Sequence, residues 1–460
     1  MGSCAQPRSL RSAVSRSGPA SGPSADRQLA AGVLLRQLER AGRVDLWLAQ
    51  AQDVSPVDRR RAWALVYGVL RSKTLLEAQL APFLKKPMAR QPRAVQVALY
   101  LGAYELSSMD AVPDRAAVHQ AVELCRRLGK PGASGFVNAV LRRLSRRESP
   151  VTLPGREEQP RAWAEQVASH PRWIVDSMVD RVGPVEAASW CDTNNSKPPV
   201  HLRFAAAEVP EDLDLQPLEL IDGAYHLGSE QGPVGSLPGF TEGRFWVQDG
   251  AAQAVGLMLG LKPGMKVLDA CAAPGGKTLA AAREVGSQGQ VVAIDRSDDR
   301  LDLLRNSLQR TGFSAVEVQQ RDLLRQPWGS LERDPCFDAV LLDAPCTGLG
   351  VIRRHPEVRW ARSAGDPKSS HCNQLKLLRS LVPALAAGGA LVYSVCSFTR
   401  QETDDVIEAF LSAESDFELV DPRPLVPASM EPLLDGRVLR PYPHRHNLDA
   451  FFAARLERRS

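Results

Sequence analysis

Hydrophobic and polar positions divide the chain into a helical part and a part in which strands and helices alternate. From Asp26 to about Arg147 apolar residues recur at helical spacing, and no segment alternates as a half-buried strand would. Two groups show this spacing clearly: Ala117, Val118, Ala121, Val122 and Cys125, then Phe136, Val140 and Leu144. The pattern predicts an all-helical N-terminal domain over residues 26–147.

After the helical part, residues 148–160 are rich in proline, glycine and charge, which is typical of a linker. Residues 161–244 include one clear strand candidate, Val200–Phe204, and are predicted to form a small α/β connecting subdomain.

From Phe245 to the C-terminus, residues 245–460, buried strands alternate with helices. The predicted strands are Lys266–Ala270, Gln290–Asp295, Ala315–Gln319, Phe337–Leu342 and Ala390–Tyr393, and the predicted helices include Asp299–Thr311 and Gln374–Leu385. Phe451–Leu456, preceded by Arg437–Arg440, is expected to add a closing antiparallel pair. Such alternation predicts a Rossmann-like α/β domain with a doubly wound parallel sheet.

The net charge of +4 conceals an asymmetry between these parts. Residues 1–150 hold 24 Lys and Arg against 11 Asp and Glu, whereas the remainder holds 33 against 42. A basic module on an acidic body is the charge distribution expected of a nucleic-acid-binding appendage, although an arginine-rich solvated surface would look the same. Candidate phosphate contacts on the last predicted helix are Arg142, Arg143, Arg146 and Arg147.

Composition excludes several classes of protein. No apolar stretch approaches the roughly 18 residues of a membrane span. The eight cysteines contain no CxxC pair, which argues against structural zinc and a secreted disulfide scaffold and favours a reducing cytoplasm. Residues 1–25 lack acidic side chains and are predicted to be a disordered basic tail, with an organellar transit peptide as the alternative. We expect no metal, and monomer is the default assumption.

Two cysteines stand out because each follows a predicted buried strand. Cys346 lies in Leu-Asp-Ala-Pro-Cys-Thr-Gly and Cys396 in Val-Tyr-Ser-Val-Cys-Ser. Ligands of open α/β sheets bind beyond the carboxyl ends of the strands, so both sulfurs are expected at that edge. Addition of a thiolate to carbon 6 of a pyrimidine activates carbon 5 for methylation, and a second group must release the adduct. The alternative is that both are small core residues.

A third candidate feature follows the first predicted strand of the sheet. The loop consists of Cys271, Ala272, Ala273, Pro274, Gly275, Gly276 and Lys277, and it leads into a helix. Small residues at a helix N-terminus predict a binding loop for a nucleotide-like cofactor. A Walker A loop would need glycine where Cys271 stands. Asp295 ends the next strand, where a carboxylate can bind ribose hydroxyls, and Asp322 follows the third strand, near the expected adenine.

These segments resemble the RNA cytosine carbon-5 methyltransferases of the RsmB/Nop2 (Sun) family. The resemblance is carried by Val247–Gln253, Cys271–Thr278, Asp343–Gly350 and Tyr393–Ser397. In the N-terminal part Val66–Leu70, Leu101–Leu106, Val112–Pro113 and Gly135–Arg143 resemble the NusB-like RNA-binding domain found in the small-subunit ribosomal RNA branch of that family.

The resemblance implies a class I S-adenosylmethionine-dependent enzyme that methylates a cytosine of 16S ribosomal RNA, free or in a small-subunit assembly intermediate. It assigns the cofactor to Cys271–Lys277, with Asp295 at the ribose, Asp322 at the adenine and Asp343 beside the site of methyl transfer. It also makes Cys396 the nucleophile and Cys346 the residue that promotes release. Lys277 is expected to position the pyrimidine, and Arg353 and Arg354 to hold its phosphate.

Three positions depart from the family pattern, namely Val395, Thr403 and Asn447–Ala450, and none removes a group that the chemistry needs. Two alternatives remain open: the same chemistry on transfer RNA or large-subunit RNA, and a non-catalytic RNA-binding ribosome-assembly factor.

Overall fold

The computed structural model describes residues 22–40, 42–206, 209–210, 212–228, 231–328 and 336–459. Most of the predicted basic tail, residues 1–21, lies outside the described residues. Residue contacts separate the chain into two units, one formed by residues 1–69 and 76–151 and the other by 70–75 and 152–460. In the described ranges, no helix has the length and apolar content needed to cross a membrane.

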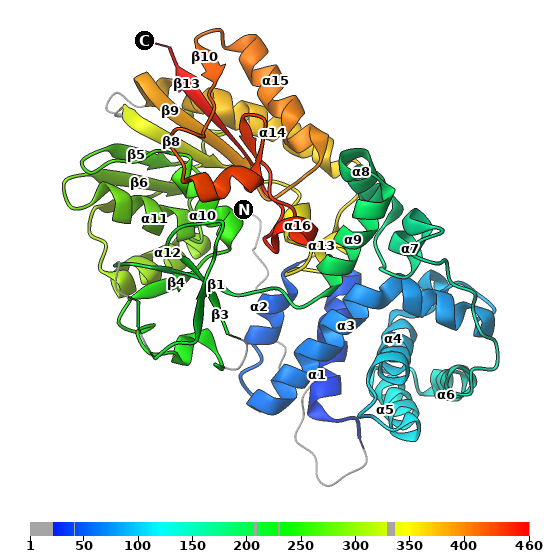
Figure 1. The fold of residues 1–460 in the computed structure, drawn as a ribbon. Coiled ribbons are helices and arrows are strands. Elements are labelled where there is room, and N and C mark those ends of the chain that lie inside the picture. Colours follow the sequence, from blue (N-terminus) through cyan, green and yellow to red (C-terminus); the bar gives the residue numbers. More distant parts are fainter. Residues whose placement is uncertain are drawn as a thin grey trace, which may run out of the picture. The chain divides into compact units, whose positions relative to one another are not determined.

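The first unit is helical, as predicted (Figure 1). Its helices are α1 Ala25–Glu39, α2 Val44–Ala49, α3 Pro56–Leu80, α4 Arg93–Ser108, α5 Asp114–Arg127 and α6 Ser134–Ser145. Helix α4 is buried on most of its surface because α1, α5 and α6 all pack against it. One expected core position was wrong: Phe136 is 36% exposed. The buried stripe of α6 runs instead through Val137, Val140 and Leu141.

The second unit begins with three short helices, α7 Pro160–Gln166, α8 Arg172–Val182 and α9 Pro184–Asn195. They share a core with residues of the later sheet domain, including Phe398 and Tyr442, whose rings both contact Trp190. A four-stranded antiparallel sheet follows, in the order β2-β3-β1-β4. Its strands are β1 His201–Phe204, which confirms the predicted strand, β2 Leu215–Pro217, β3 Ala224–Leu227 and β4 Phe245–Val247.

The main sheet has nine strands, with the path β11-β12-β13-β9-β8-β5-β6-β7 and β10 paired to β13. The parallel strands are β5 Lys266–Asp269, β6 Gln290–Asp295, β7 Val316–Gln320, β8 Phe337–Asp343 and β9 Leu385–Val395. The antiparallel edge consists of β10 Phe417–Leu419, β11 Leu434–Asp435, β12 Val438–Leu439 and β13 Phe452–Arg458. The predicted doubly wound sheet and its closing antiparallel pair are therefore confirmed.

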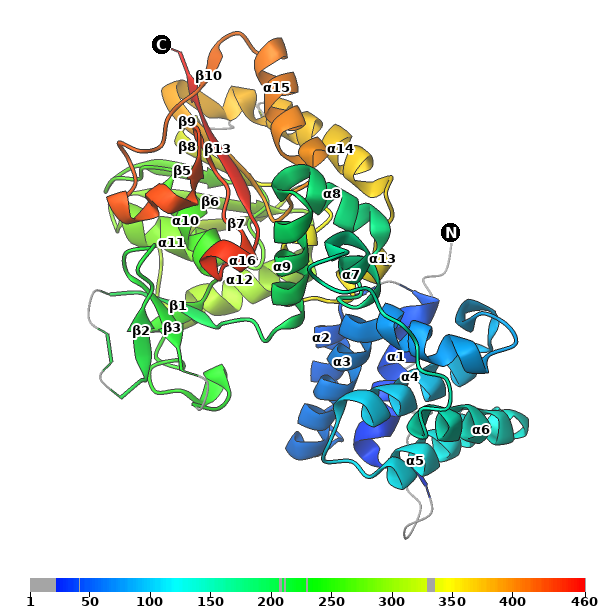
Figure 2. The same cartoon turned by 45° about the vertical axis from the view of Figure 1, so that its right-hand side comes forward.

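Helices cover both faces of this sheet. Helices α10 Gly250–Leu257, α11 Gly276–Val285 and α12 Asp298–Thr311 lie on one side, and α14 Asp366–Leu381 and α15 Asp404–Ala413 lie on the other (Figures 1 and 2). Successive side chains of β8 alternate accordingly: Ala339 and Leu341 belong to one core, Val340 and Leu342 to the other. Burial on both faces explains why these strands are continuous apolar runs in the sequence.

One helix and the strand after it were predicted with wrong boundaries. The helix expected at Gln374–Leu385 is α14, which begins at Asp366 and ends at Leu381, and β9 begins at Leu385 rather than Ala390. The early turns of α14 are polar, so apolar spacing did not reveal them, although Pro367 stands at a first-turn position that favours a helix start. Pro383 ends the helix because it has no amide hydrogen to donate.

Candidate active site

The two predicted cysteines meet at the carboxyl edge of the main sheet. Strands β8 and β9 are parallel neighbours, with Asp343 opposite Ser394. Cys346 follows β8 after two residues and Cys396 follows β9 directly, and their Sγ atoms lie 3.4 Å apart. The backbone of Gly350 lies close to this segment, and its amide donates to the carbonyl of Cys396 at 2.9 Å. A Cβ at this position would lie 1.9 Å from the carbonyl oxygen of Ala450.

The surroundings of Cys346 disfavour its thiolate. The hydrogen bond with Cys396 and burial hold the pKa of Cys346 well above its usual range. Cys346 therefore keeps its proton at neutral pH and can donate it to the sulfur of Cys396. Both cysteines are partly exposed.

Lys277 and Asp343 form an ion pair beside the cysteines. Lys277 Nζ donates to Asp343 Oδ2 at 2.7 Å, and Ser394 Oγ donates to Asp343 Oδ1 at 2.7 Å. The ammonium lies 5.1 Å from the centre of the Phe451 ring. Burial opposes the charge of Lys277, but the carboxylate of Asp343 outweighs it and raises the pKa of the amine. Lys277 is therefore a protonated donor at this edge.

The predicted cofactor loop connects β5 to α11. Gly275 has φ of 113°, and a Cβ there would lie 2.4 Å from Cδ1 of Leu304, so only glycine fits. Asp295 ends β6 and accepts hydrogen bonds from the amides of Ala273 and Ser297 at 3.3 and 3.0 Å. Burial raises the pKa of Cys271, which makes this thiol a neutral lining group of the loop rather than a nucleophile.

Asp269 is a site residue that sequence reasoning did not select. It ends β5 just before the loop, is 1% exposed, and accepts a hydrogen bond from Thr278 Oγ1 at 2.7 Å through Oδ2. Its Oδ1 is buried without a partner, and burial raises its pKa to about 7. A buried acceptor without a donor beside a glycine-rich cradle fits a cofactor that carries a cationic group. Its place as the last residue of a buried strand was the available signal.

Asp322 follows β7 as predicted, and its position is compatible with a cofactor contact. Its side chain is about one-third exposed and accepts a hydrogen bond from the amide of Leu324 at 3.1 Å. Asp269 and Asp295, which end β5 and β6, and Asp322, two residues after β7, thus lie along one edge of the sheet.

The predicted RNA contacts divide into two groups. Arg142, Arg143, Arg146 and Arg147 are all exposed on or just after α6, and Arg143 and Arg146 pair with Glu148. Arg353 and Arg354, by contrast, are held by internal partners, which argues against their expected grip on a phosphate. Arg353 is 7% exposed and donates to Asn447 and to the carbonyl of Lys197.

Arg354 joins two buried carboxylates. It donates to Asp249 at 2.6 Å and to Asp449 at 2.7 Å. Asp249 also accepts from the amide of Ala251 as the N-cap of α10. This arginine therefore links the start of α10 to the C-terminal segment, and sequence reasoning misread it because two adjacent arginines look the same whether they face solvent or carboxylates.

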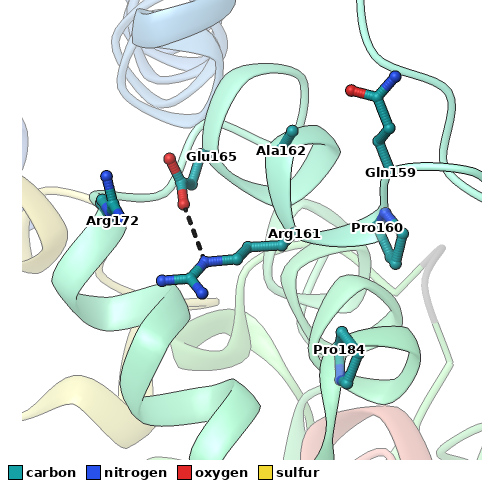
Figure 3. A pocket seen from close by; sticks show the side chains of 7 residues that line it. All are labelled: Gln159, Pro160, Arg161, Ala162, Glu165, Arg172 and Pro184. Carbon is teal, nitrogen blue, oxygen red and sulfur yellow. Dashed lines mark ion pairs between the residues drawn. The ribbon is translucent and has the colours of Figure 1, made fainter.

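A surface hollow of about 570 Å³ lies among α7, the start of α8 and the start of α9 (Figure 3). Its lining residues are Gln159, Pro160, Arg161, Ala162, Glu165, Arg172 and Pro184. Arg161 is paired with Glu165 and Asp176, and none of the residues singled out above lines the hollow. The hollow is therefore separate from the residues predicted for the site.

Comparisons with known proteins agree with this arrangement. Residues 256–457 match the family described as 16S rRNA methyltransferase RsmB/F, and residues 25–146 match the NusB family. Ribosomal RNA small subunit methyltransferase B of Klebsiella pneumoniae is 34% identical over 418 residues, which cover 89% of this chain and 92% of that protein.

The chain belongs to the RsmB/F methyltransferase family.

Solved structures show the same fold as this family member. The crystal structure of PH0851 has a TM-score of 0.76 at 21% identity and covers 94% of this chain and 99% of its own. NSun6 from Pyrococcus horikoshii, crystallised with SFG, has a TM-score of 0.54 at 18% identity and covers 63% of this chain and 98% of its own. The first match includes both units, so the NusB-like helical part and the sheet domain occur together in another chain.

Proposed function

We propose that this RsmB/F family member methylates carbon 5 of a cytosine in 16S ribosomal RNA, with Cys396 as nucleophile and Cys346 as the residue that promotes release. The observation that carries the proposal is the 3.4 Å separation of the two sulfurs at the carboxyl edge of the sheet. Both cysteines are partly buried, and each packs against the core beneath its strand while its sulfur contacts the other.

S-adenosylmethionine, when bound, supplies the methyl group. The residues that would hold it are Cys271–Lys277 with Asp269, Asp295 and Asp322, because these present a glycine turn, a buried acceptor without a partner and two further carboxylates. NSun6 with SFG, a S-adenosylmethionine analogue, has the same fold and supports this choice of cofactor.

Addition begins when the thiolate of Cys396 forms a bond to carbon 6 of the cytosine. The electron pair of the ring double bond then moves toward carbon 5 and the ring, and Lys277 with Asp343 can deliver a proton to ring nitrogen 3. The raised pKa of Lys277 keeps that proton available until the base docks. Methylation at carbon 5 leaves a saturated adduct.

Release requires loss of the hydrogen on carbon 5, after which the electron pair reforms the double bond and expels the sulfur of Cys396. Cys346 is next to that sulfur, and its thiol can protonate the departing thiolate while the resulting Cys346 anion takes up the ring proton. Cys346 thus ends as the thiol that it was, the proton on ring nitrogen 3 returns to Lys277, and Cys396 ends protonated and gives its proton to solvent before the next turnover, so one proton is released for each methyl group transferred.

The basic N-terminal helices support an RNA substrate, since Arg142, Arg143, Arg146 and Arg147 are exposed there. The relative from Klebsiella, named for the small-subunit RNA, favours 16S RNA over transfer RNA or large-subunit RNA. The seven cysteines of the described ranges are all free, which fits a reducing compartment such as the cytoplasm.

The test is transfer of a labelled methyl group from S-adenosylmethionine to a 16S RNA transcript by wild type, Cys396→Ala and Cys346→Ala. We expect transfer by wild type, none by Cys396→Ala, and a covalent protein–RNA adduct on denaturing gels with Cys346→Ala. An adduct that persists in Cys396→Ala and is lost in Cys346→Ala would reverse the two roles. Transfer to transfer RNA but not to 16S RNA would move the substrate, and no transfer to any RNA would favour the non-catalytic assembly factor.

A further inference from the structure

Glu402 is a buried carboxylate between the two cysteine loops. It ends the short 3₁₀ helix Arg400–Glu402 after β9, and its side chain is 0% exposed. Its backbone carbonyl accepts a hydrogen bond from the hydroxyl of Tyr393 in β9 at 2.7 Å. The residue is therefore fixed to the core at its backbone while its carboxylate points toward the loops.

The carboxylate collects donors from both loops. Thr347, which follows Cys346, donates its amide to Oε1 at 2.7 Å and its hydroxyl to Oε2 at 2.5 Å. Ser397, which follows Cys396, donates its hydroxyl to Oε2 at 2.5 Å. Thr399 adds a hydroxyl at 3.0 Å, so one oxygen atom joins hydrogen bonds from both chain segments.

A second link passes through Gln374 of α14. Its side-chain amide donates to Glu402 Oε1 at 3.4 Å and to the carbonyl of Pro345 at 3.1 Å, on the other side of Cys346. No lysine or arginine among the described residues forms an ion pair with Glu402. Hydrogen bonds alone therefore compensate for the burial of this side chain, and a polar group buried in this way is stable only when its donors are held in place.

We propose that Glu402 is a positioning residue that holds the Cys346 and Cys396 loops together, so that the two sulfurs stay within reach of one another during the reaction. This inference rests on the proposed two-cysteine function. Without the carboxylate, five donor groups from four residues lose their shared acceptor. Among the described residues, the hydroxyls of Thr347 and Ser397 at 3.3 Å, the two sulfurs and the amide of Gly350 with the carbonyl of Cys396 still join the loops, but no remaining acceptor collects donors from both. Separated sulfurs slow the proton exchange that releases the methylated base, even though both cysteines are present.

The experiment compares full-length wild type with Glu402→Ala, Glu402→Gln and Asp405→Ala. Asp405 is the matched control: it is an acidic residue three positions further on, it pairs with Arg400, and no hydrogen bond or ion pair among the described residues joins it to Cys346–Thr347 or Cys396–Ser397. For each protein we would measure single-turnover methyl transfer to 16S RNA, affinity for S-adenosylhomocysteine by calorimetry, and the lifetime of the covalent adduct on denaturing gels.

We expect Glu402→Ala to transfer the methyl group about 10²-fold more slowly, as a misplacement of about 1 Å can cause, and to keep its covalent adduct longer. Affinity for S-adenosylhomocysteine should not change, because the carboxylate does not contact Cys271–Lys277. Glu402→Gln should recover most of the rate, since the hydroxyls of Thr347 and Ser397 can accept from its amide as well as donate to its oxygen. Asp405→Ala should match wild type.

Wild-type transfer by Glu402→Ala would overturn the inference, as would a rate for Glu402→Gln as low as that of the alanine variant. A parallel loss of cofactor affinity would point to general collapse of the site and would also contradict it. If Glu402→Ala does not fold, Ser397→Ala is measured in its place. We expect Ser397→Ala to slow methyl transfer at unchanged affinity for S-adenosylhomocysteine, and a wild-type rate of transfer by this variant would refute the positioning role of Glu402. Inactivity of wild type itself would refute the proposed function instead.

Discussion

Substitution of Asp269 by asparagine tests the cofactor site through the pH dependence of binding. Burial raises the pKa of Asp269 to about 7, and its Oδ1 has no partner in the described structure. A cation bound beside it prefers the ionised carboxylate. S-adenosylmethionine and S-adenosylhomocysteine both carry an ammonium group, so their affinity should rise as Asp269 loses its proton.

The magnitude follows from the fraction ionised. With a pKa near 7, about one-tenth of the molecules are ionised at pH 6 and about nine-tenths at pH 8, so affinity should rise roughly tenfold over this range. In Asp269→Asn this contribution disappears, and any dependence that remains belongs to the ligand and to other groups. Calorimetric titration of both proteins with S-adenosylhomocysteine at pH 6, 7 and 8 isolates the difference.

The same shift predicts a stability effect of defined sign. The folded-state pKa is above the ordinary value of 3.8, so the stabilising contribution is complete below that value and is lost as pH rises through about 7. Between pH 5 and pH 8 the loss amounts to about 2 to 3 kcal/mol in the ligand-free protein. Urea unfolding at both pH values should show a smaller decline for Asp269→Asn. Equal declines, together with equal pH dependence of binding, would refute the assignment.

Three further results are expected. Arg354→Ala should lower the free energy of unfolding by about 3 to 5 kcal/mol, because two buried carboxylates lose their shared cation. Burial and the charge of Asp249 raise the pKa of Asp449, so Asp449 can take up a proton at pH 5.5 and the loss measured in urea should be smaller there. A loss at pH 5.5 equal to that at pH 8 would contradict this expectation. Gly275→Ala should cost about 1 to 3 kcal/mol of stability and weaken S-adenosylhomocysteine binding, because Gly275 has φ of 113° and Leu304 occupies the space that the new Cβ would need. The control is Gly286→Ala, which tests the effect of positive φ alone because a Cβ there meets no neighbour within 4 Å. Joint replacement of Arg142 and Arg146 by alanine should weaken RNA binding and reduce its salt dependence by about one to two released counterions. The measurement is filter binding at 50 to 200 mM salt, and an unchanged slope of log affinity against log salt concentration would exclude these residues from phosphate contact.

Much of the sheet domain could be predicted because the strands are buried on both faces. Gln290–Asp295 coincides with β6, and Phe337–Leu342 differs from β8 by one residue, since a continuous apolar run can satisfy two covered faces. The polar first half of α14 could not be predicted in the same way. Apart from Pro367 in the first turn, its buried residues begin at Gln374, and the turns between them have no apolar spacing to detect.

The residues of the candidate site likewise fall into some that could be predicted from the sequence and some that could not. Cys346 and Cys396 could be selected from the sequence because each closely follows an apolar strand. The roles expected of Asp343 and Lys277 came from the family resemblance of the segments that contain them. The positions of Glu402 and Arg354 could not be predicted. From the sequence alone, a glutamate in a polar stretch or an arginine beside another arginine could equally face solvent or a buried partner.

The order of strands and helices, the basic helical part and the chemical groups at the strand ends were thus determined by the sequence itself, because local periodicity and residue chemistry depend on near neighbours along the chain. The tertiary structure alone decided that the two sulfurs lie 3.4 Å apart, that Glu402 joins their loops, that Asp269 keeps an unpaired oxygen and that Arg354 binds two carboxylates. Those relations arise between residues distant in sequence, and burial, which the strand packing creates, determines their protonation and their partners.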